Sequence, residues 1–334
     1  MRYRPSFTSD TEIIGKLTRD YGLPLKKLQF LPVGEDSWCY LAEEDERNWF
    51  VKIARRGLYP PSVIIPALLQ NVSGYRFVNP VVPDRQGLLW NKLAEHDFVV
   101  YPFVKGITAM DCVLSAKHWQ GFGRMLAMLH ETRLDEDTRH GLKVEDFVPS
   151  WADGAKRVVM HAATEDHLGA AGELVQFIQE RESEIRAIIA RAEELGRKLQ
   201  RHQLELVLCH ADPNLSNILL AEDGRILLVD WDGVMLAPRE RDLMFFTGEG
   251  QEAFMCGYDS DGTYKFNLTA IAYYKYEWVV QEFYDYGSRI FFANLDEVEK
   301  QYALKEFVKL FDRGDVVQDA YEADADLTDL QYTP

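Results

Sequence analysis

Polar side chains of the kinds that bind metals and accept protons lie between two apolar runs in the stretch CHADPNLSNILL, residues 209–220. Within it, His210, Asp212 and Asn217 follow the spacing His-x-Asp-x-x-x-x-Asn. Asp230 comes eighteen residues after Asp212, at the end of the apolar run RILLVD. Aspartate and asparagine in loops mostly make turns and caps, so the first spacing alone is a moderate signal. When Asp230 follows at this distance, the combined pattern becomes a strong signal.

The apolar runs around these residues predict two short strands joined through LAEDGR, in which EDG is a turn signal. Such a hairpin brings Asp212, Asn217 and Asp230 to one edge. Oxygen-bearing side chains are the ligands that a hard divalent cation prefers. Asn217 and Asp230 can therefore hold Mg²⁺, which leaves Asp212 to accept the proton of a substrate hydroxyl, as in phosphoryl transfer. We interpret His210 as a packed, hydrogen-bonded residue rather than a catalyst.

A lysine inside an apolar strand supplies a second candidate site. Lys52 alternates with Val51 and Ile53 in NWFVKIA, and Gly34 and Ser37 lie in a turn before the preceding strand. A strand lysine commonly extends to solvent, and that interpretation stays open. Given the Asp and Asn motif, we predict that Lys52 binds the α- and β-phosphates of a nucleotide. The turn has one glycine where kinase loops have three.

These candidate residues require a sheet to position them. Short β-rich runs at residues 25–33, 38–44, 48–54, 87–93 and 97–104 predict about five strands, mostly antiparallel. A helix starts at the capping box of Ser9 and Glu12 and ends at Gly22 and Pro24. A short helix is expected at about 62–69.

From about Ile107 onward the pattern is helical. Apolar residues recur at helical spacing over 115–132 and 172–200, and an aromatic helix is expected over 270–292. The exceptions are the two short runs around the Asp and Asn motif. The sequence therefore predicts an α+β protein with a nucleotide-binding part at 1–104, a hinge near 101–105 and a helical part at 105–334.

Composition limits the classes of function. The chain has 334 residues, a formal net charge of −17 and 47% hydrophobic residues, so a sizeable core is expected and binding to nucleic acid or anionic membranes is not. No signal peptide or membrane-spanning run is recognisable, and four widely spaced cysteines favour a reducing compartment. We expect a cytoplasmic protein whose partners are small molecules.

The segment from Cys209 to Phe246 resembles the catalytic core of the aminoglycoside phosphotransferase family, and its form VDWDGVMLAPRERDLMF is most similar to the spectinomycin phosphotransferases within it. The resemblance implies a bilobal protein-kinase-like fold with a small, mainly antiparallel N-lobe and a larger helical C-lobe. It implies that Asp212 is the catalytic base and that Asn217 and Asp230 bind Mg²⁺.

By the same resemblance, ATP is the co-substrate, and the Tyr101 carbonyl and the Phe103 amide contact the adenine edge. The family builds its acceptor pocket from C-terminal helices. There YYKYEWVVQEFYDYG interleaves acids with aromatic residues, and Glu277 and Gln281 share one helical face. Carboxylates and aromatic faces attract an ammonium group. We therefore expect Glu277, Gln281, Asp285 and Asp232 to contact substrate, although acids at the surface and aromatics in the core remain an alternative interpretation.

One departure from the kinase pattern keeps other functions open. A kinase lysine pairs with a glutamate on the next helix, yet the segment between Lys52 and Leu88 contains only Asp84 as an acid. The first hypothesis is an ATP- and Mg²⁺-dependent kinase for a hydroxyl of a cationic aminocyclitol such as spectinomycin. The second is a metabolic kinase for a choline-like, homoserine-like or sugar alcohol. The third is a nucleotide-binding module without turnover.

Overall fold

The structure is a computed structural model, and it describes residues 4–34, 37–45, 47–72, 74–163 and 168–331. The chain forms two compact units. Unit 1 comprises residues 1–143, 208–236 and 248–262, and unit 2 comprises residues 144–207, 237–247 and 263–334. The chain passes between the units five times. Three of these passages lie in short strands, β7 (Lys143–Val144), β8 (Val207–Cys209) and β11 (Met235–Ala237), and the other two lie after residues 247 and 262.

Unit 1 contains the predicted antiparallel sheet, in the order β1-β2-β3-β5-β4. The prediction of an antiparallel N-terminal sheet followed by a mainly helical region is confirmed. The strands of this sheet are β1 (Lys27–Leu31), β2 (Ser37–Glu43), β3 (Asn48–Ala54), β4 (Asn91–Leu93) and β5 (His96–Pro102). Alternation along each strand gives the sheet two different faces.

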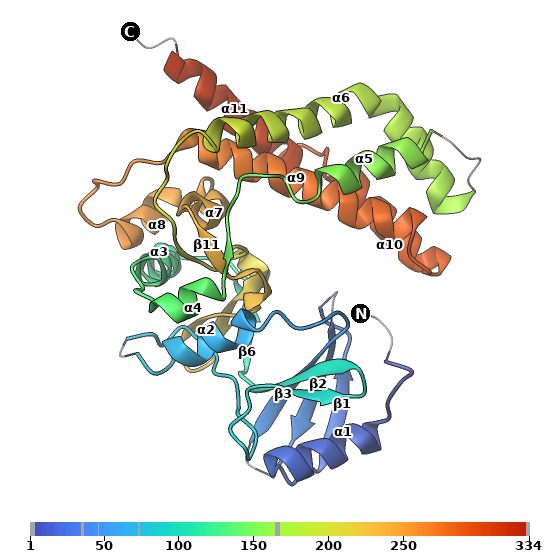
Figure 1. The fold of residues 1–334 in the computed structure, drawn as a ribbon, viewed down its shortest axis with the longest axis vertical. Helices are drawn as coiled ribbons and strands as arrows, with labels where there is room; N and C mark the ends of the chain where they lie inside the picture. Colours follow the sequence, from blue (N-terminus) through green and yellow to red (C-terminus); the bar gives the residue numbers. More distant parts are fainter. Residues whose placement is uncertain (1–3, 35–36, 46, 73, 164–167, 332–334) are drawn as a thin grey trace. The chain divides into compact units, whose positions relative to one another are not determined.

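One face of the sheet packs against the N-terminal helix. Helix α1 (Asp10–Lys16) begins at the predicted capping box of Ser9 and continues as a π-helical turn, η1 (Leu17–Tyr21). It buries Ile13 and Leu17 against strand residues of the same cluster, including Tyr40, Val51, Ile53, Phe98 and Val100. The opposite face, which carries Lys52, has a second cluster around Val63 of α2 (Pro61–Leu69) and Val99. Helix α2 lies where the sequence predicts it (Figure 1).

The motif residues lie in the loop and turns beside a separate small sheet of unit 1, which has the order β10-β9-β6. The predicted hairpin is present, since β9 (Ile218–Ala221) pairs antiparallel with β10 (Ile226–Leu228). Strand β6 (Gly106–Thr108), in the region expected to be helical, pairs with β9. This pairing places the chain after residue 104 in unit 1, whereas the sequence boundary at 104 is drawn from a change in local pattern and stays a prediction.

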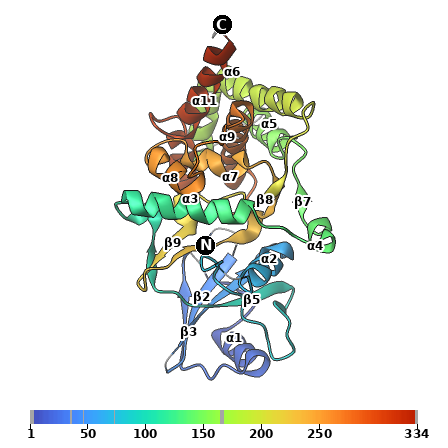
Figure 2. The same ribbon diagram turned by 90° about the vertical axis from the view of Figure 1, so that its left-hand side faces the viewer.

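Unit 1 also contains further helices and helical turns. Helix α3 (Ala116–His130) packs closely against α8 (Gln251–Tyr258), as Figure 2 shows. The remaining elements are α4 (Glu136–His140) and the short 3-10 turns η2 (Ala109–Asp111), η3 (Leu215–Asn217) and η4 (Trp231–Gly233).

Unit 2 is a helical bundle centred on α9 (Leu268–Phe291), which packs against α5, α6, α10 and α11 (Figure 1). The predicted helix at 172–200 is α6 (Gly169–Leu199), which has a non-helical residue at Arg181. The other elements are α5 (Ala152–His161), α7 (Glu240–Leu243), η5 (Met244–Phe246), α10 (Glu297–Lys309) and α11 (Val316–Gln331). No helix in the described ranges combines the length and apolar character needed to cross a membrane.

Candidate active site

The loop that carries Asp212 is held by His210. The His210 side chain is fully buried, and its Nε2 lies 3.1 Å from the Val229 carbonyl oxygen. Its Nδ1 lies 3.4 Å from the backbone nitrogen of Asp212. A carbonyl oxygen only accepts and a backbone N–H only donates, so these two contacts fit the Nε2–H tautomer. His210 therefore links the loop to the end of β10, which agrees with its interpretation as a packed residue.

Two amide side chains orient the Asp212 carboxylate. Asn217 Nδ2 donates to Oδ2 of Asp212 and to its backbone oxygen, each at 2.9 Å, and Asn214 Nδ2 donates to Oδ1 at 2.6 Å. Ala211, immediately before Asp212, has a φ of +72°, a left-handed conformation that is strained for a residue with a Cβ. Asp212 itself is half-buried.

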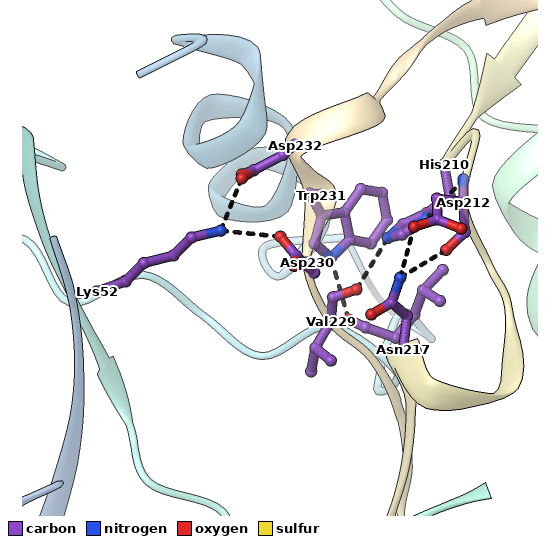
Figure 3. A network of polar contacts seen from close by, with 9 residues as sticks. Lys52, His210, Asp212, Asn217, Val229, Asp230, Trp231 and Asp232 are labelled. Carbon is purple, nitrogen blue, oxygen red and sulfur yellow. Dashed lines mark hydrogen bonds and ion pairs between the residues drawn. The ribbon is translucent and has the colours of Figure 1, made fainter. Parts of the chain in front are cut away.

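The hairpin brings Asp230 to the same place. The Val229 amide donates to the Asn217 carbonyl at 2.9 Å, which fixes the end of β10 beside the Asp and Asn loop. Asp230 follows with a φ of +61°, and Trp231 is buried next to it. The sequence-predicted convergence of Asp212, Asn217 and Asp230 is thus present in unit 1, and Figure 3 shows these residues around Val229.

Lys52 of β3 reaches this group across unit 1. Its Nζ donates to Oδ1 of Asp230 and to Oδ2 of Asp232, each at 2.8 Å (Figure 3). The lysine side chain is 13% exposed, whereas those of Asp230 and Asp232 are 50% and 53% exposed. The alternative that Lys52 extends alone into solvent is therefore wrong.

The charges of this cluster favour ionised side chains. The surrounding protein opposes ionisation of Asp230, but the charge and hydrogen bond of Lys52 outweigh that effect and hold the pKa of Asp230 below its usual value. Burial acts against the Lys52 ammonium, but Asp230 and Asp232 raise its pKa above the usual value. Lys52 is thus a fixed positive charge, of the kind that binds phosphate oxygens.

The oxygens near Asp230 fit a divalent cation. Because Asn217 Nδ2 donates twice to Asp212, its amide orientation is settled, and Oδ1 faces away from Asp212 (Figure 3). Asp230 has a second carboxylate oxygen besides the one that accepts from Lys52. An amide oxygen and a carboxylate oxygen are donors that Mg²⁺ accepts while keeping several waters. The residues present therefore fit the predicted metal.

The other nucleotide-site candidates are Gly34, Ser37, Tyr101 and Phe103, whose nucleotide contacts stay predictions. Gly34 has a φ of +75°, where glycine is favoured, and Ser37 is a buried residue that begins β2. Tyr101 of β5 lies two residues from Val99, the cross-strand neighbour of Lys52, and so occupies the same face. The Phe103 amide already donates to the Asn48 carbonyl at 2.9 Å, so its predicted adenine contact would require that bond to be exchanged.

The substrate candidates on α9 belong to unit 2. Glu277 is only 8% exposed and accepts from Arg241 Nη1 at 2.8 Å, so its charge is already paired. Asp285 pairs with Arg289 at 2.8 Å, one turn along the helix. Gln281 is half-buried on the same helix. A substrate role for these three residues stays a prediction, and the Arg241 pair counts against Glu277. Asp232, in contrast, lies in the cluster of unit 1.

Sequence reasoning did not assign a role to Asn214, although it donates the shorter of the two side-chain bonds to Asp212. Its Oδ1 also accepts from Ser216, which makes the loop an Asx turn. The signal was present in the sequence, because asparagine side chains in loops commonly accept from the backbone two residues further on. An Asx turn accounts for the asparagine without any role in the site, and only the structure shows that its Nδ2 points to Asp212.

Phosphoryl-transfer enzymes of the protein-kinase-like class divide their work among these residue types in this order along the chain, so the fold and the site define that class. The model of the phosphotransferase enzyme family, APH, matches residues 27–254, and the chain belongs to that family. The resemblance noted from the sequence is confirmed, and the protein is a phosphotransferase.

Individual relatives agree with this assignment. Protein StrN of Streptomyces griseus is 27% identical over 247 residues, which is 72% of each chain. A crystal structure of spectinomycin phosphotransferase APH(9)-Ia with ADP and spectinomycin matches with a TM-score of 0.84 at 25% identity, over 95% of this chain and 99% of that one. Choline kinase LicA of Streptococcus pneumoniae, with a TM-score of 0.57 at 16% identity over 90% of this chain and 99% of that one, shares the fold.

Proposed function

We propose that the protein transfers the γ-phosphoryl group of ATP, with Mg²⁺, to a hydroxyl of a small cationic molecule, an aminocyclitol such as spectinomycin. The observation that carries this proposal is the contact set of one cluster in unit 1. There a carboxylate oriented by two amides lies beside an asparagine and an aspartate that suit a metal, and a lysine is bonded to that aspartate.

In the proposed reaction Asp212 accepts the proton of the acceptor hydroxyl. The hydroxyl oxygen forms a bond to the γ-phosphorus, the bond from that phosphorus to the bridging oxygen breaks, and ADP leaves with the electron pair. The two amide donors hold the Asp212 carboxylate in place for this proton. Lys52 neutralises charge on the phosphates of ATP. Bound Mg²⁺ would add charge neutralisation at the phosphates, with Asn217 and Asp230 as its protein ligands.

Two observations support a cationic acceptor. The solved relative with a TM-score of 0.84 is a spectinomycin phosphotransferase, and its crystal structure contains spectinomycin. The formal net charge of −17 raises the local concentration of cations near the protein surface, which favours an amine-bearing acceptor over a neutral one. Neither observation depends on a substrate role for Glu277, Gln281 or Asp285 of α9.

The test is a coupled ADP-release assay with ATP, Mg²⁺ and a panel of acceptors. The panel contains spectinomycin, other aminocyclitols and aminoglycosides, choline, ethanolamine, homoserine and neutral sugar alcohols. We expect spectinomycin or a close aminocyclitol to accelerate ADP release most, with a phosphorylated product by mass spectrometry and no product when EDTA removes the metal. A higher kcat/KM for choline, homoserine or a sugar alcohol would instead establish the metabolic kinase. Acceleration by no acceptor would contradict the proposal.

A further inference from the structure

Helix α2 lacks the acid that anchors the lysine in a protein kinase. Its sequence PSVIIPALL has no acidic residue. Asp84, the only acid between Lys52 and Leu88, is used elsewhere. Its Oδ1 accepts from the amides of Gln86 and Leu88, each at 2.8 Å, and its Oδ2 accepts from Asn91 at 3.0 Å. Asp84 therefore closes a loop, and both of its carboxylate oxygens accept hydrogen bonds within that loop.

Lys52 instead has two acidic partners from one turn. Asp230 and Asp232 each accept from its Nζ at 2.8 Å. They lie on either side of Trp231, which is 5% exposed and whose Nε1 donates to the Leu228 carbonyl at 3.0 Å. The buried indole fixes the turn, so both carboxylates face the lysine (Figure 3).

The turn that carries Asp232 also rests on α2. η4 packs against α2 within unit 1. Trp231, whose indole is fixed by its hydrogen bond to the Leu228 carbonyl, is the first residue of η4. Asp232 thus lies beside the helix that would otherwise supply the glutamate. Asp232 differs from Asp230 in that only Asp230 is also a proposed metal ligand. Once Asp230 is engaged by the metal, Asp232 is the remaining one of the two partners of Lys52.

We propose that Asp232 is the positioning residue of Lys52 and takes the place of the glutamate missing from α2. Asp230 shares the lysine in the nucleotide-free state, and Asp232 keeps the ammonium aimed at the phosphates when Asp230 turns to the metal. This inference rests on the proposed function for the role of Lys52. It makes the departure from the kinase pattern a relocation of the acid, not a loss.

The test is a double-mutant cycle of Asp232→Asn and Lys52→Ala in the full-length protein, with ATP affinity by calorimetry and steady-state kinetics. Asp232→Asn keeps the size of the side chain and removes its charge. We expect it to lower kcat/KM for ATP roughly tenfold to a hundredfold in the wild-type background and to have almost no further effect in the Lys52→Ala background. Asp232→Glu, which restores the charge, should recover most of the loss.

Three results would overturn the inference. Equal losses in both backgrounds would show that Asp232 acts without Lys52, and an unchanged kcat/KM for ATP would show that it is dispensable. A raised Mg²⁺ requirement in Asp232→Asn, with ATP affinity intact, would make Asp232 a metal ligand. If the wild-type protein phosphorylates no acceptor, the proposed function fails, but the same cycle measured by ATP affinity still decides whether Asp232 acts through Lys52. Urea unfolding midpoints check that each variant is folded.

Discussion

At the scale of single residues, the Asn217 amide combines a hydrogen-bond donor with an acceptor oxygen, and the proposed function uses both. Its Nδ2 orients Asp212, and its Oδ1 is left for a metal. Asn214 does the first without the second, because its Oδ1 accepts from Ser216. In the proposed reaction, Asn217 would thus both position the base and bind the cation, whereas Asn214 would only position the base.

We predict that Asn217→Ala raises the Mg²⁺ concentration for half-maximal activity about tenfold or more, since it removes a proposed protein ligand of the metal. Asn214→Ala is the matched control. It removes one donor to Asp212 and should lower kcat about tenfold at an unchanged Mg²⁺ requirement, because a hydrogen bond to a charged group is worth roughly 1.5–3 kcal/mol. A Mg²⁺ titration of both variants measures this. Equal Mg²⁺ requirements would refute the assignment of Asn217.

At the scale of elements, unit 1 depends on a close approach of α3 and α8. A Cβ on Gly123 of α3 would overlap the Phe254 carbonyl oxygen, and a Cβ on Gly257 of α8 would overlap the Gln120 carbonyl oxygen. These obstacles are backbone atoms and cannot rotate away. The two glycines are required by contact between the helices, and neither has a positive φ.

We predict that Gly123→Ala lowers the free energy of unfolding by about 1–3 kcal/mol, the usual cost of inserting a methyl group into a packed contact. The control is Gly15→Ala in α1, where nothing lies within 4 Å of the added Cβ. Because alanine is the better helix former, this change should raise the free energy of unfolding by up to about 1 kcal/mol. Urea denaturation measures both. Equal stabilities of the two variants would argue against the α3–α8 contact.

The sequence predicted the elements with strong local patterns. The five-stranded sheet, α1 with its capping box, α2 and the β9–β10 hairpin all follow from alternation, caps and turn residues. It did not predict β6, because three residues give no usable period and the strand exists only through its pairing with β9. The acidic partner of Lys52 was also missed, since a contact across 180 residues to Asp232 leaves no local trace.

At the scale of the whole molecule, several phenols and the thiols of Cys39 and Cys209 are buried. The protein has 16 tyrosines, and burial raises the pKa of Tyr21 and of Tyr40 to about 12. Burial likewise raises the pKa of the Cys39 thiol to about 11. In the unfolded chain these phenols ionise near pH 10 and the thiol near pH 9. The unfolded state therefore loses protons first as the pH rises.

We predict that the free energy of unfolding falls between about pH 9 and pH 12. Below pH 8 the ionisation of these groups should not change it. The stabilising effect is fully present below the unfolded pKa values and is lost as the pH rises through the folded ones. Each of Tyr21 and Tyr40 contributes up to about 2–3 kcal/mol to this loss. Urea denaturation at intervals from pH 8 to pH 11 measures it, with ultraviolet absorbance following tyrosinate. A stability that stays constant to pH 11 would contradict the burial of these groups.

The central claim is that Asp212 accepts the proton of the acceptor hydroxyl. The most direct measurement is the turnover of Asp212→Asn with ATP, Mg²⁺ and the best acceptor, together with its affinity for ATP. General-base catalysis contributes roughly 10²- to 10⁴-fold, so we predict a loss of kcat in that range or complete loss, with ATP affinity largely unchanged. A variant that retains near-normal kcat would contradict the account.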